Sequence, residues 1–497
     1  MAAHAVLLDP DLMLRVFESC TEGLTLDVDD KALANSAICC QAWSYPSIKV
    51  LWRHMHSPIP LFKILPSFKL MEGTYIMDRR PSESEWSRFL EYGRCIRSLF
   101  LLNPYSLDPA SLLTLSQLAS NNPPTPFLRI LVLAYPIPGA LIFLSPSLRK
   151  VTLYGANGSS SRNPRLEAGS PEHGEMLQLI SRLPSLSPNI TNLKIHSVVP
   201  GITKYIGSLT NLQTLGIVGM KYEEVTRLLR SLPCLKHLDT SFNGTSPDAD
   251  APTSRATFPQ LETLSLRGHI TRMIDALTNW STPSLTQITL SLTCNILADD
   301  IHDCFTRFPS SVTSFSIIII APNTQAEYPP VNLISLFDPL RRLRGLETLI
   351  VALISQKRNP SFTLLDGDAE LIGSSWPKLR HLCFHVRPQV YETGFTFLVH
   401  LARRCPLLQR LDIAFDTSNL PKHCEITVSN HRLAILVVLP GGRMDDDLRG
   451  TASLLNRLFP ELDGLVISPS FASDDERRGK WMEVDEYLRD FYAAGKR

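Results

Sequence analysis

The chain has 497 residues, which is too long for one compact core and indicates either several domains or a repeat array that grows along one axis. Its 49 Lys and Arg residues almost balance its 48 Asp and Glu residues, so there is no net field to attract nucleic acid or an anionic membrane. The hydrophobic fraction of 44% is that of a folded protein and excludes a disordered one.

Neither membrane insertion nor secretion is expected. No apolar run approaches the ~20 residues that cross a bilayer, and the N-terminus lacks the basic and then apolar order of a signal peptide. We therefore expect the protein in the cytosol, the nucleus or both.

The ten cysteines contain no C-x-x-C pair, and Cys383 and others lie in apolar stretches as small core residues. No metal and no cofactor are predicted.

The sequence pattern of residues 1–56 predicts short helices. Asp9 can cap a first helix that has Pro10 in its first turn, and a second helical stretch begins at Asp30. A segment this small needs a partner or a following domain to cover its apolar surface.

This segment resembles an F-box. The run "LDPDLMLRVF" is similar to the opening helix of that family, "CQAW" to its Cys-x-x-Trp and "VLW" to its closing Leu-Trp. The continuation through "PLFKILP" and "EWSRFLEYGRCIRSL" resembles fungal-type F-box proteins that carry degenerate leucine-rich repeats. The segment differs from the family pattern at Asp9, which replaces a Pro, at Asp11, which replaces a Glu, and in an extra loop at 21–30.

In the F-box family the helices bind a Skp-type adaptor, which joins a cullin-based ubiquitin ligase, while the repeats select the protein to be modified. The resemblance implies that the F-box core or adaptor-binding face consists of Leu8, Pro10, Leu12, Val16, Phe17, Cys40, Trp43, Leu51 and Trp52. The alternative is that these apolar residues only cover the end of the repeat array, and both interpretations can hold.

A short phrase, apolar-x-x-apolar-x-apolar, recurs about fourteen times from residue 96 onward, with "LETLSL" from Leu261 as a clear copy. Nine of the thirteen start-to-start spacings lie between 20 and 29 residues, the interval typical of leucine-rich repeats. The longest spacing contains 155–174, a stretch rich in Ser, Gly, Asn and Pro that predicts an exposed loop.

Prolines mark the ends of the repeats. A bulky residue followed by Pro precedes many of the phrases, as at 183–184, 258–259 and 376–377. Because proline cannot continue a helix, it is expected to stop each returning helix before the next strand. The predicted fold class is therefore α/β: a small N-terminal helical F-box, then a curved leucine-rich-repeat solenoid with a parallel sheet on its concave face and helices on its convex face. The predicted domains are 1–56, a helical linker at 57–95, and repeats at 96–497.

Alternation along each strand predicts where a partner binds. In "LETLSL", Leu264 and Leu266 point to the core, so Ser265 and Arg267 point away from it. Stacked repeats would line up such polar positions into one surface for a protein partner. The candidates are Lys194, His196, His237, Asp239, Ser265, Arg267, His381, His385, Arg410 and Asp412.

No nucleotide-binding loop, hydrolase elbow or metalloprotease motif is present, so we predict a protein without enzymatic activity. The acidic cluster 299–303 is interpreted as a helix start.

The leading hypothesis is a substrate-recognition subunit of a Skp–cullin–F-box ubiquitin ligase that binds an unknown protein. The rivals are a repeat scaffold independent of any ligase, and a hydrolase whose site lies in the loops 155–175 or 244–257.

Overall fold

The computed structural model shows an α/β protein that divides into two compact units. The first unit contains residues 1–220 and 224–235, and the second contains 221–223 and 236–497. The structure describes residues 9–21, 30–102, 107–119, 122–135, 137, 139–155, 169–242, 255–293, 298–320, 331–354, 362–385, 393–421, 431–439, 443–462, 464–468 and 475–495.

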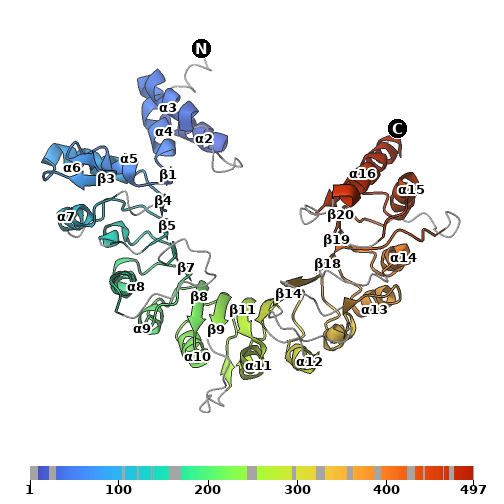
Figure 1. Cartoon of the computed structure of the whole chain (residues 1–497). Helices are drawn as coiled ribbons and strands as arrows, with labels where there is room; N and C mark the ends of the chain where they lie inside the picture. Colours follow the sequence, from blue (N-terminus) through green and yellow to red (C-terminus); the bar gives the residue numbers. More distant parts are fainter. Residues whose placement is uncertain are drawn as a thin grey trace. The chain divides into compact units, whose positions relative to one another are not determined.

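Short parallel strands form one ladder in the first unit (Figure 1). Their order in the ladder is their order in the chain, as expected when each repeat packs on the previous one. The strands are β1 (His54–Met55), β4 (Ser98–Leu101), β5 (Ile130–Leu133), β6 (Lys150–Leu153), β7 (Asn192–Ile195) and β8 (Thr214–Met220). The ladder thus begins at β1, before the first repeat phrase of the sequence.

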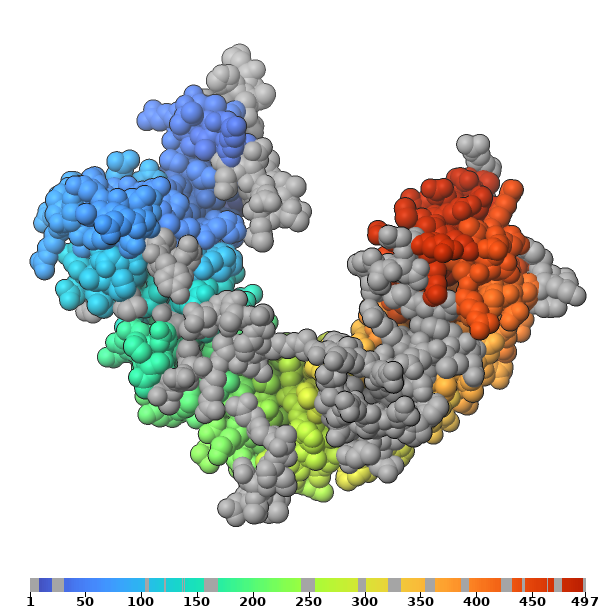
Figure 2. All heavy atoms as spheres, in the orientation of Figure 1, coloured from blue at the N-terminus to red at the C-terminus, as the bar shows by residue number. Residues whose placement is uncertain are grey.

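Helices of the first unit precede the ladder or connect its strands. Three of them, from α2 to α4, form the N-terminal segment, which stands at the end of the unit (Figures 1 and 2). Its helix α4 leads into β1 (Figure 1). The helices are α2 (Pro10–Thr21), α3 (Asp30–Cys39), α4 (Gln41–Leu51), α5 (Ile59–Phe62), α6 (Glu83–Gly93), α7 (Pro109–Ala119), the 3₁₀ helix η2 (Ala140–Phe143), α8 (Pro171–Leu186) and α9 (Thr203–Ile206). Helix α10 (Tyr222–Arg230) contains the boundary between the units.

The expected helical linker at 57–95 contains a β-hairpin, so the helical prediction is wrong for its central part. Antiparallel strands β2 (Phe68–Met71) and β3 (Thr74–Met77) lie between α5 and α6. The two turn residues, Glu72 and Gly73, have φ angles of 49° and 83°. A two-residue turn with both φ angles positive matches the right-handed twist of the paired strands, and glycine adopts it without steric cost.

The second unit contains a second parallel ladder, again in chain order (Figure 1). Its strands are β9 (His237–Phe242), β11 (Thr263–His269), β13 (Gln287–Thr293), β14 (Ser314–Ile320), β16 (Thr348–Ile354), β18 (His381–His385), β19 (Arg410–Ile413), β20 (Ile435–Val438) and β21 (Leu465–Ile467). Across both units, every repeat phrase of the sequence contains a strand that starts two or three residues after the phrase begins. The predicted parallel repeat strands are confirmed.

Helices follow the strands of the second unit on one side of its ladder (Figure 1). They are α11 (Ile270–Asn279), α12 (Ala298–Thr306), the 3₁₀ helix η3 (Ser335–Arg342), α13 (Asp368–Ser375), α14 (Phe395–Arg404), α15 (Leu448–Leu458) and α16 (Asp475–Gly495). Two small parallel sheets pair β10 (Ala256–Thr257) with β12 (Trp280–Ser281) and β15 (Val331–Asn332) with β17 (Phe362–Thr363). Among the helices in the described ranges, none has both the length and the apolar character to cross a bilayer.

The strands align their aliphatic residues in register. In the second unit one buried row joins residues that are direct partners on neighbouring strands: Leu238, Leu264, Ile288, Phe315, Leu349, Leu382, Leu411, Leu436 and Leu465. Leu264 and Leu266 are buried while Arg267 is exposed, as the alternation in "LETLSL" predicts. Each strand therefore completes the core of the strand before it.

Prolines follow the ends of three helices in the second unit, as predicted. Helices α13, α14 and α15 end at Ser375, Arg404 and Leu458, in each case two residues before a proline. The prediction is wrong at Pro184, which lies inside α8. The helix continues to Leu186 because a proline in the last turn removes a single backbone hydrogen bond, and the Ser187 N–H still donates to the Leu183 carbonyl at 2.8 Å.

Other sequence predictions are only partly covered by the structure. Of the expected loop at 155–174, residues 156–168 lie outside the described part, and its last residues belong to α8. Pro259 follows β10 and not a helix. The acidic cluster at 299–303 lies in the first turns of α12, as expected for a helix start.

Removing an aromatic side chain from the core of the second unit should destabilise the protein. Phe305 is fully buried, with ring-centroid distances of 5.3 Å to Phe315 and 5.5 Å to Phe337. We expect Phe305→Ala to lower the free energy of unfolding by about 3–5 kcal/mol, because it leaves a cavity. Urea unfolding followed by circular dichroism measures this. The control is Leu407→Ala, whose side chain is 45% exposed, and it should change the free energy of unfolding by less than about 0.5 kcal/mol. Equal shifts would contradict the core assignment.

Candidate functional site

The structure places the predicted partner-binding residues on or beside strands of both units. Lys194 lies on β7 of the first unit and His196 directly follows it, and both are half-buried. The others lie in the second unit, where His237 and Asp239 are on β9, Ser265 and Arg267 on β11, His381 and His385 on β18, and Arg410 and Asp412 on β19. In the second unit, strands β13, β14 and β16 separate the β9–β11 residues from the β18–β19 residues, so these form two distinct groups.

In the first unit, Lys194 and His196 each have a defined neighbour. The ring of His196 stacks on Tyr154, with 4.6 Å between the ring centroids and an interplanar angle of 9°. Lys194 is the direct strand partner of Gly216, where a Cβ atom would lie 3.2 Å from the Lys194 Cγ. The glycine therefore leaves room for the lysine stem on this face of the ladder.

The β9–β11 group is an open polar surface. Arg267 Nη2 donates to Asp239 Oδ2 at 2.6 Å across the two strands. Both side chains are more than one-third exposed, and an ion pair of this kind contributes about 0–1 kcal/mol to stability. These charges are thus accessible to a partner, and the fold does not depend on them.

The β18–β19 group surrounds a buried carboxylate. Only 4% of the Asp412 side chain is exposed, yet it accepts hydrogen bonds from Arg410 Nε at 2.8 Å and Arg410 Nη2 at 3.0 Å. The Nε2 atoms of His381 and His385 approach its two oxygens at 3.8 Å and 3.6 Å. Two imidazoles and one guanidinium therefore converge on a single carboxylate.

Opposing effects set the pKa of Asp412. Burial raises the pKa, but the approach of His385 and the hydrogen bonds from Arg410 outweigh burial and hold the pKa below its ordinary value. Burial also lowers the pKa of His381, which favours the neutral imidazole. Asp412 is accordingly a carboxylate at neutral pH, and His381 is an uncharged neighbour.

Cys383 belongs to this group, although its apolar surroundings in the sequence suggested an ordinary core residue. It is buried, and it is the direct strand partner of Asp412. Because strand side chains alternate, it faces the same side as His381 and His385, two residues before and after it. The His-x-Cys-x-His spacing was the sequence signal for this placement. Burial first, and then the charge of Asp412, raise the pKa of Cys383 to about 12.

The helices α2 to α4 pack around a small apolar core. Met13, Phe17, Leu33 and Val50 are buried in it, and Leu14, Trp43 and Leu51 pack against it. The ring centroids of Phe17 and Trp43 are 6.3 Å apart in an edge-to-face arrangement. Asp9 caps α2 as predicted, since its Oδ1 accepts from the N–H groups of residues 11 and 12.

The residues implied by the F-box resemblance separate into two sets. Phe17, Trp43 and Leu51 contribute to the small core, whereas Trp52 contacts Tyr92 of α6 at a ring-centroid distance of 4.7 Å. The exposed set is Pro10, Leu12, Val16 and Cys40. Leu8 lies outside the described residues.

One cavity of about 210 Å³ lies in the second unit beside Trp280 and Arg307. Leu264, Leu277 and Pro309 also line it. Small-molecule sites usually enclose about 300–1,000 Å³, so this cavity is too small to be a typical ligand pocket.

Comparisons with known proteins leave the family of the chain open. No protein-family model and no curated protein matches it. It is similar to the solved structure of the leucine-rich repeat-containing protein LegL7 from Legionella pneumophila, with 13% identity, coverage of 69% of this chain and 91% of that one, and a TM-score of 0.32. A Bacteroides fragilis protein gives 14% identity, 54% and 66% coverage and a TM-score of 0.28. These scores support no functional inference, so the leucine-rich-repeat description rests on the parallel ladders themselves.

Proposed function

We propose that the chain is the substrate-recognition subunit of a cullin-based ubiquitin ligase. Helices α2 to α4 bind a Skp-type adaptor, and the polar strand faces bind the protein to be modified, in the cytosol or the nucleus. The chain itself performs no chemistry in this role. It raises the effective concentration of the target near the conjugating enzyme, so its affinity and geometry determine the outcome.

The exposed apolar face of α2 is the main support for this proposal. Leu12 is 40% exposed and Val16 49% exposed, although Met13 and Phe17 of the same helix are buried. Residues four apart lie next to each other on a helix surface, so Leu12 and Val16 form one apolar patch. A patch of this kind, held on a packed core, suits a protein adaptor.

A scaffold that functions without any ligase is the second candidate, and a specific observation favours it. The carbonyl of Arg53, just after α4, accepts backbone hydrogen bonds from Arg97 at 2.8 Å and Ser98 at 3.0 Å. The ring contact between Trp52 and Tyr92 adds to this connection. The N-terminal helices are thus joined to the start of the ladder, as a structural cap would be.

Charge introduced on the exposed face of α2 should weaken adaptor binding. We expect the double variant Leu12→Asp/Val16→Asp to bind a purified Skp-type adaptor about tenfold to a hundredfold more weakly than the unaltered chain, because a binding interface desolvates these side chains. Calorimetric titration measures the affinity. The matched control is Leu113→Asp on α7, where the side chain is also 49% exposed. Circular dichroism verifies that all variants fold.

Absence of adaptor binding by the unaltered chain would refute the ligase assignment, as would equal affinity of the double variant. Measuring the abundance of the bound protein in cells further distinguishes the ligase role from the scaffold role. In the ligase role, the double variant keeps its bound target but no longer lowers the abundance of that target. A scaffold would leave the abundance of its partner unchanged by the same substitutions.

Charge reversal on the β9–β11 surface should weaken target capture without affecting the adaptor. We expect Arg267→Glu to reduce the proteins retained by the chain severalfold, because it places a second negative charge beside Asp239. Its effect on stability should be small, since the Arg267–Asp239 pair is exposed. Quantitative mass spectrometry measures the amount of protein that each variant captures. The control is Lys378→Glu, which alters an exposed residue in a turn. Unchanged capture by Arg267→Glu would exclude this surface from target binding.

A further inference from the structure

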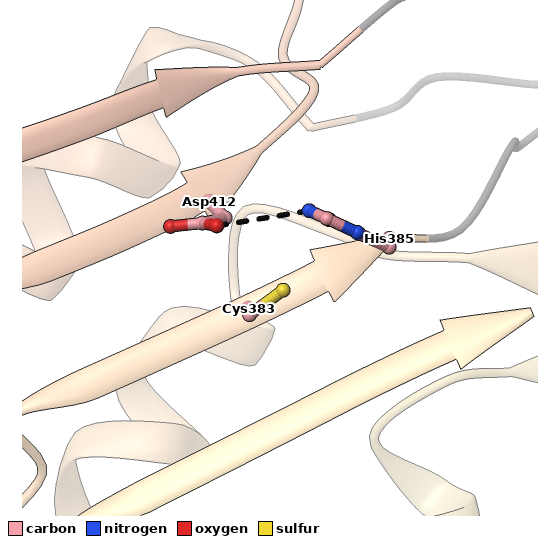
Figure 3. A group of neighbouring side chains, drawn as sticks. All are labelled: Cys383, His385 and Asp412. Atoms are coloured by element: carbon pink, nitrogen blue, oxygen red, sulfur yellow. Dashed lines mark ion pairs between the residues drawn. The ribbon is translucent and has the colours of Figure 1, made fainter. Parts of the chain in front are cut away.

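Three side chains with metal-binding atoms meet in the β18–β19 group (Figure 3). Cys383 and His385 lie two residues apart on β18, and Asp412 lies opposite Cys383 on β19. The Cys383 sulfur, one His385 ring nitrogen and one Asp412 oxygen all lie within 4.8 Å of one another. Backbone register fixes this arrangement, because neighbouring parallel strands hold direct partners side by side.

The donor atoms point to one class of cation. Thiolate and imidazole ligands suit zinc and related thiophilic divalent cations, whereas calcium and magnesium take oxygen ligands. With zinc–ligand bonds of about 2.0–2.3 Å in tetrahedral geometry, ligand atoms stand about 3.3–3.8 Å apart. The distance of 3.6 Å between His385 Nε2 and Asp412 Oδ2 lies in that range.

Residues around the three donors hold them in place. The guanidinium of Arg410 binds both oxygens of Asp412 and fixes the orientation of the carboxylate. A carboxylate offers about four acceptor positions, so two remain after Arg410 has donated. Hydrogen bonds of this kind to a ligating carboxylate are a regular feature of protein metal sites.

A second imidazole lies beside the group. His381 Nε2 is buried and has no hydrogen-bond partner among the described residues, and it lies 3.8 Å from Asp412 Oδ1. An unpaired buried nitrogen costs free energy unless some ligand or water satisfies it.

The group is open to solvent on one side. Cys383 and Asp412 are buried, but the His385 side chain at the end of β18 is 48% exposed. An ion could therefore enter beside His385 and reach the two buried ligands. Three protein ligands leave one tetrahedral position for water or for a donor from a bound protein.

We propose that Cys383, His385 and Asp412 form a binding site for one zinc-type divalent cation. When Zn²⁺ binds, a sulfur–zinc bond forms, the sulfur–hydrogen bond of Cys383 breaks, and its proton leaves to solvent. The ion replaces that proton and compensates the buried negative charge of Asp412. This site is independent of the ligase role and lies at the strand surface where a target would bind.

Titration of the purified full-length protein with Zn²⁺ and Co²⁺ tests the proposal. After treatment with a chelator and dialysis, we expect one bound ion per chain by calorimetry. Co²⁺ should give a thiolate-to-metal charge-transfer band in the near ultraviolet. Cys383→Ser should abolish that band, and His385→Ala should weaken zinc binding by at least about tenfold, the loss seen when a metal site is perturbed.

A substitution at another cysteine serves as the control for Cys383→Ser. Cys234→Ser alters a half-buried thiol that belongs to the first unit and should leave the band and the stoichiometry unchanged. Circular dichroism checks the fold of each variant. The proposal is overturned if the unaltered chain binds no ion at micromolar concentrations, or if Cys383→Ser keeps the charge-transfer band. Because adaptor binding is measured separately, failure here leaves the ligase assignment untouched.

Discussion

Each strand of this protein buries its aliphatic side chains only because the next strand lies in register beside it. A strand of three to seven residues has no core of its own, so the row from Leu238 to Leu465 in the second unit is the interaction on which that unit depends. The same register aligns the opposite face of the strands. Residues that are far apart in the sequence, such as Cys383 and Asp412, become direct neighbours there.

The two polar groups of the second unit differ in their relation to the fold. The Asp239–Arg267 pair is exposed, so it contributes little to stability and is free to interact with another molecule. Asp412 is buried, and a buried carboxylate requires compensation from charged or hydrogen-bonding neighbours. Arg410 and His385 supply it, which makes this group part of the folded structure as well as a candidate binding site.

In the N-terminal helices, residues that belong to one sequence motif differ in their burial. The resemblance to an F-box gives one set of apolar residues, and the structure buries Phe17 while it exposes Leu12 and Val16 on the same helix. In the proposed adaptor-binding role, the buried residues would hold the helix and the exposed residues would contact the adaptor.

The sequence by itself determined the repeats, the start of almost every strand and the burial of Leu264 and Leu266. Alternation and spacing are local properties, so a single chain reveals them. It missed the hairpin at 68–77, because the Glu72–Gly73 turn is weaker in sequence than Asn-Gly, and it placed a helix end wrongly at Pro184. Aligning the phrases "LRHLCF" and "LQRLDI" already pairs Cys383 with Asp412. Only the tertiary structure brought the His385 ring to 3.6 Å from the buried Asp412 carboxylate, because the rotamer of a side chain depends on the residues packed around it.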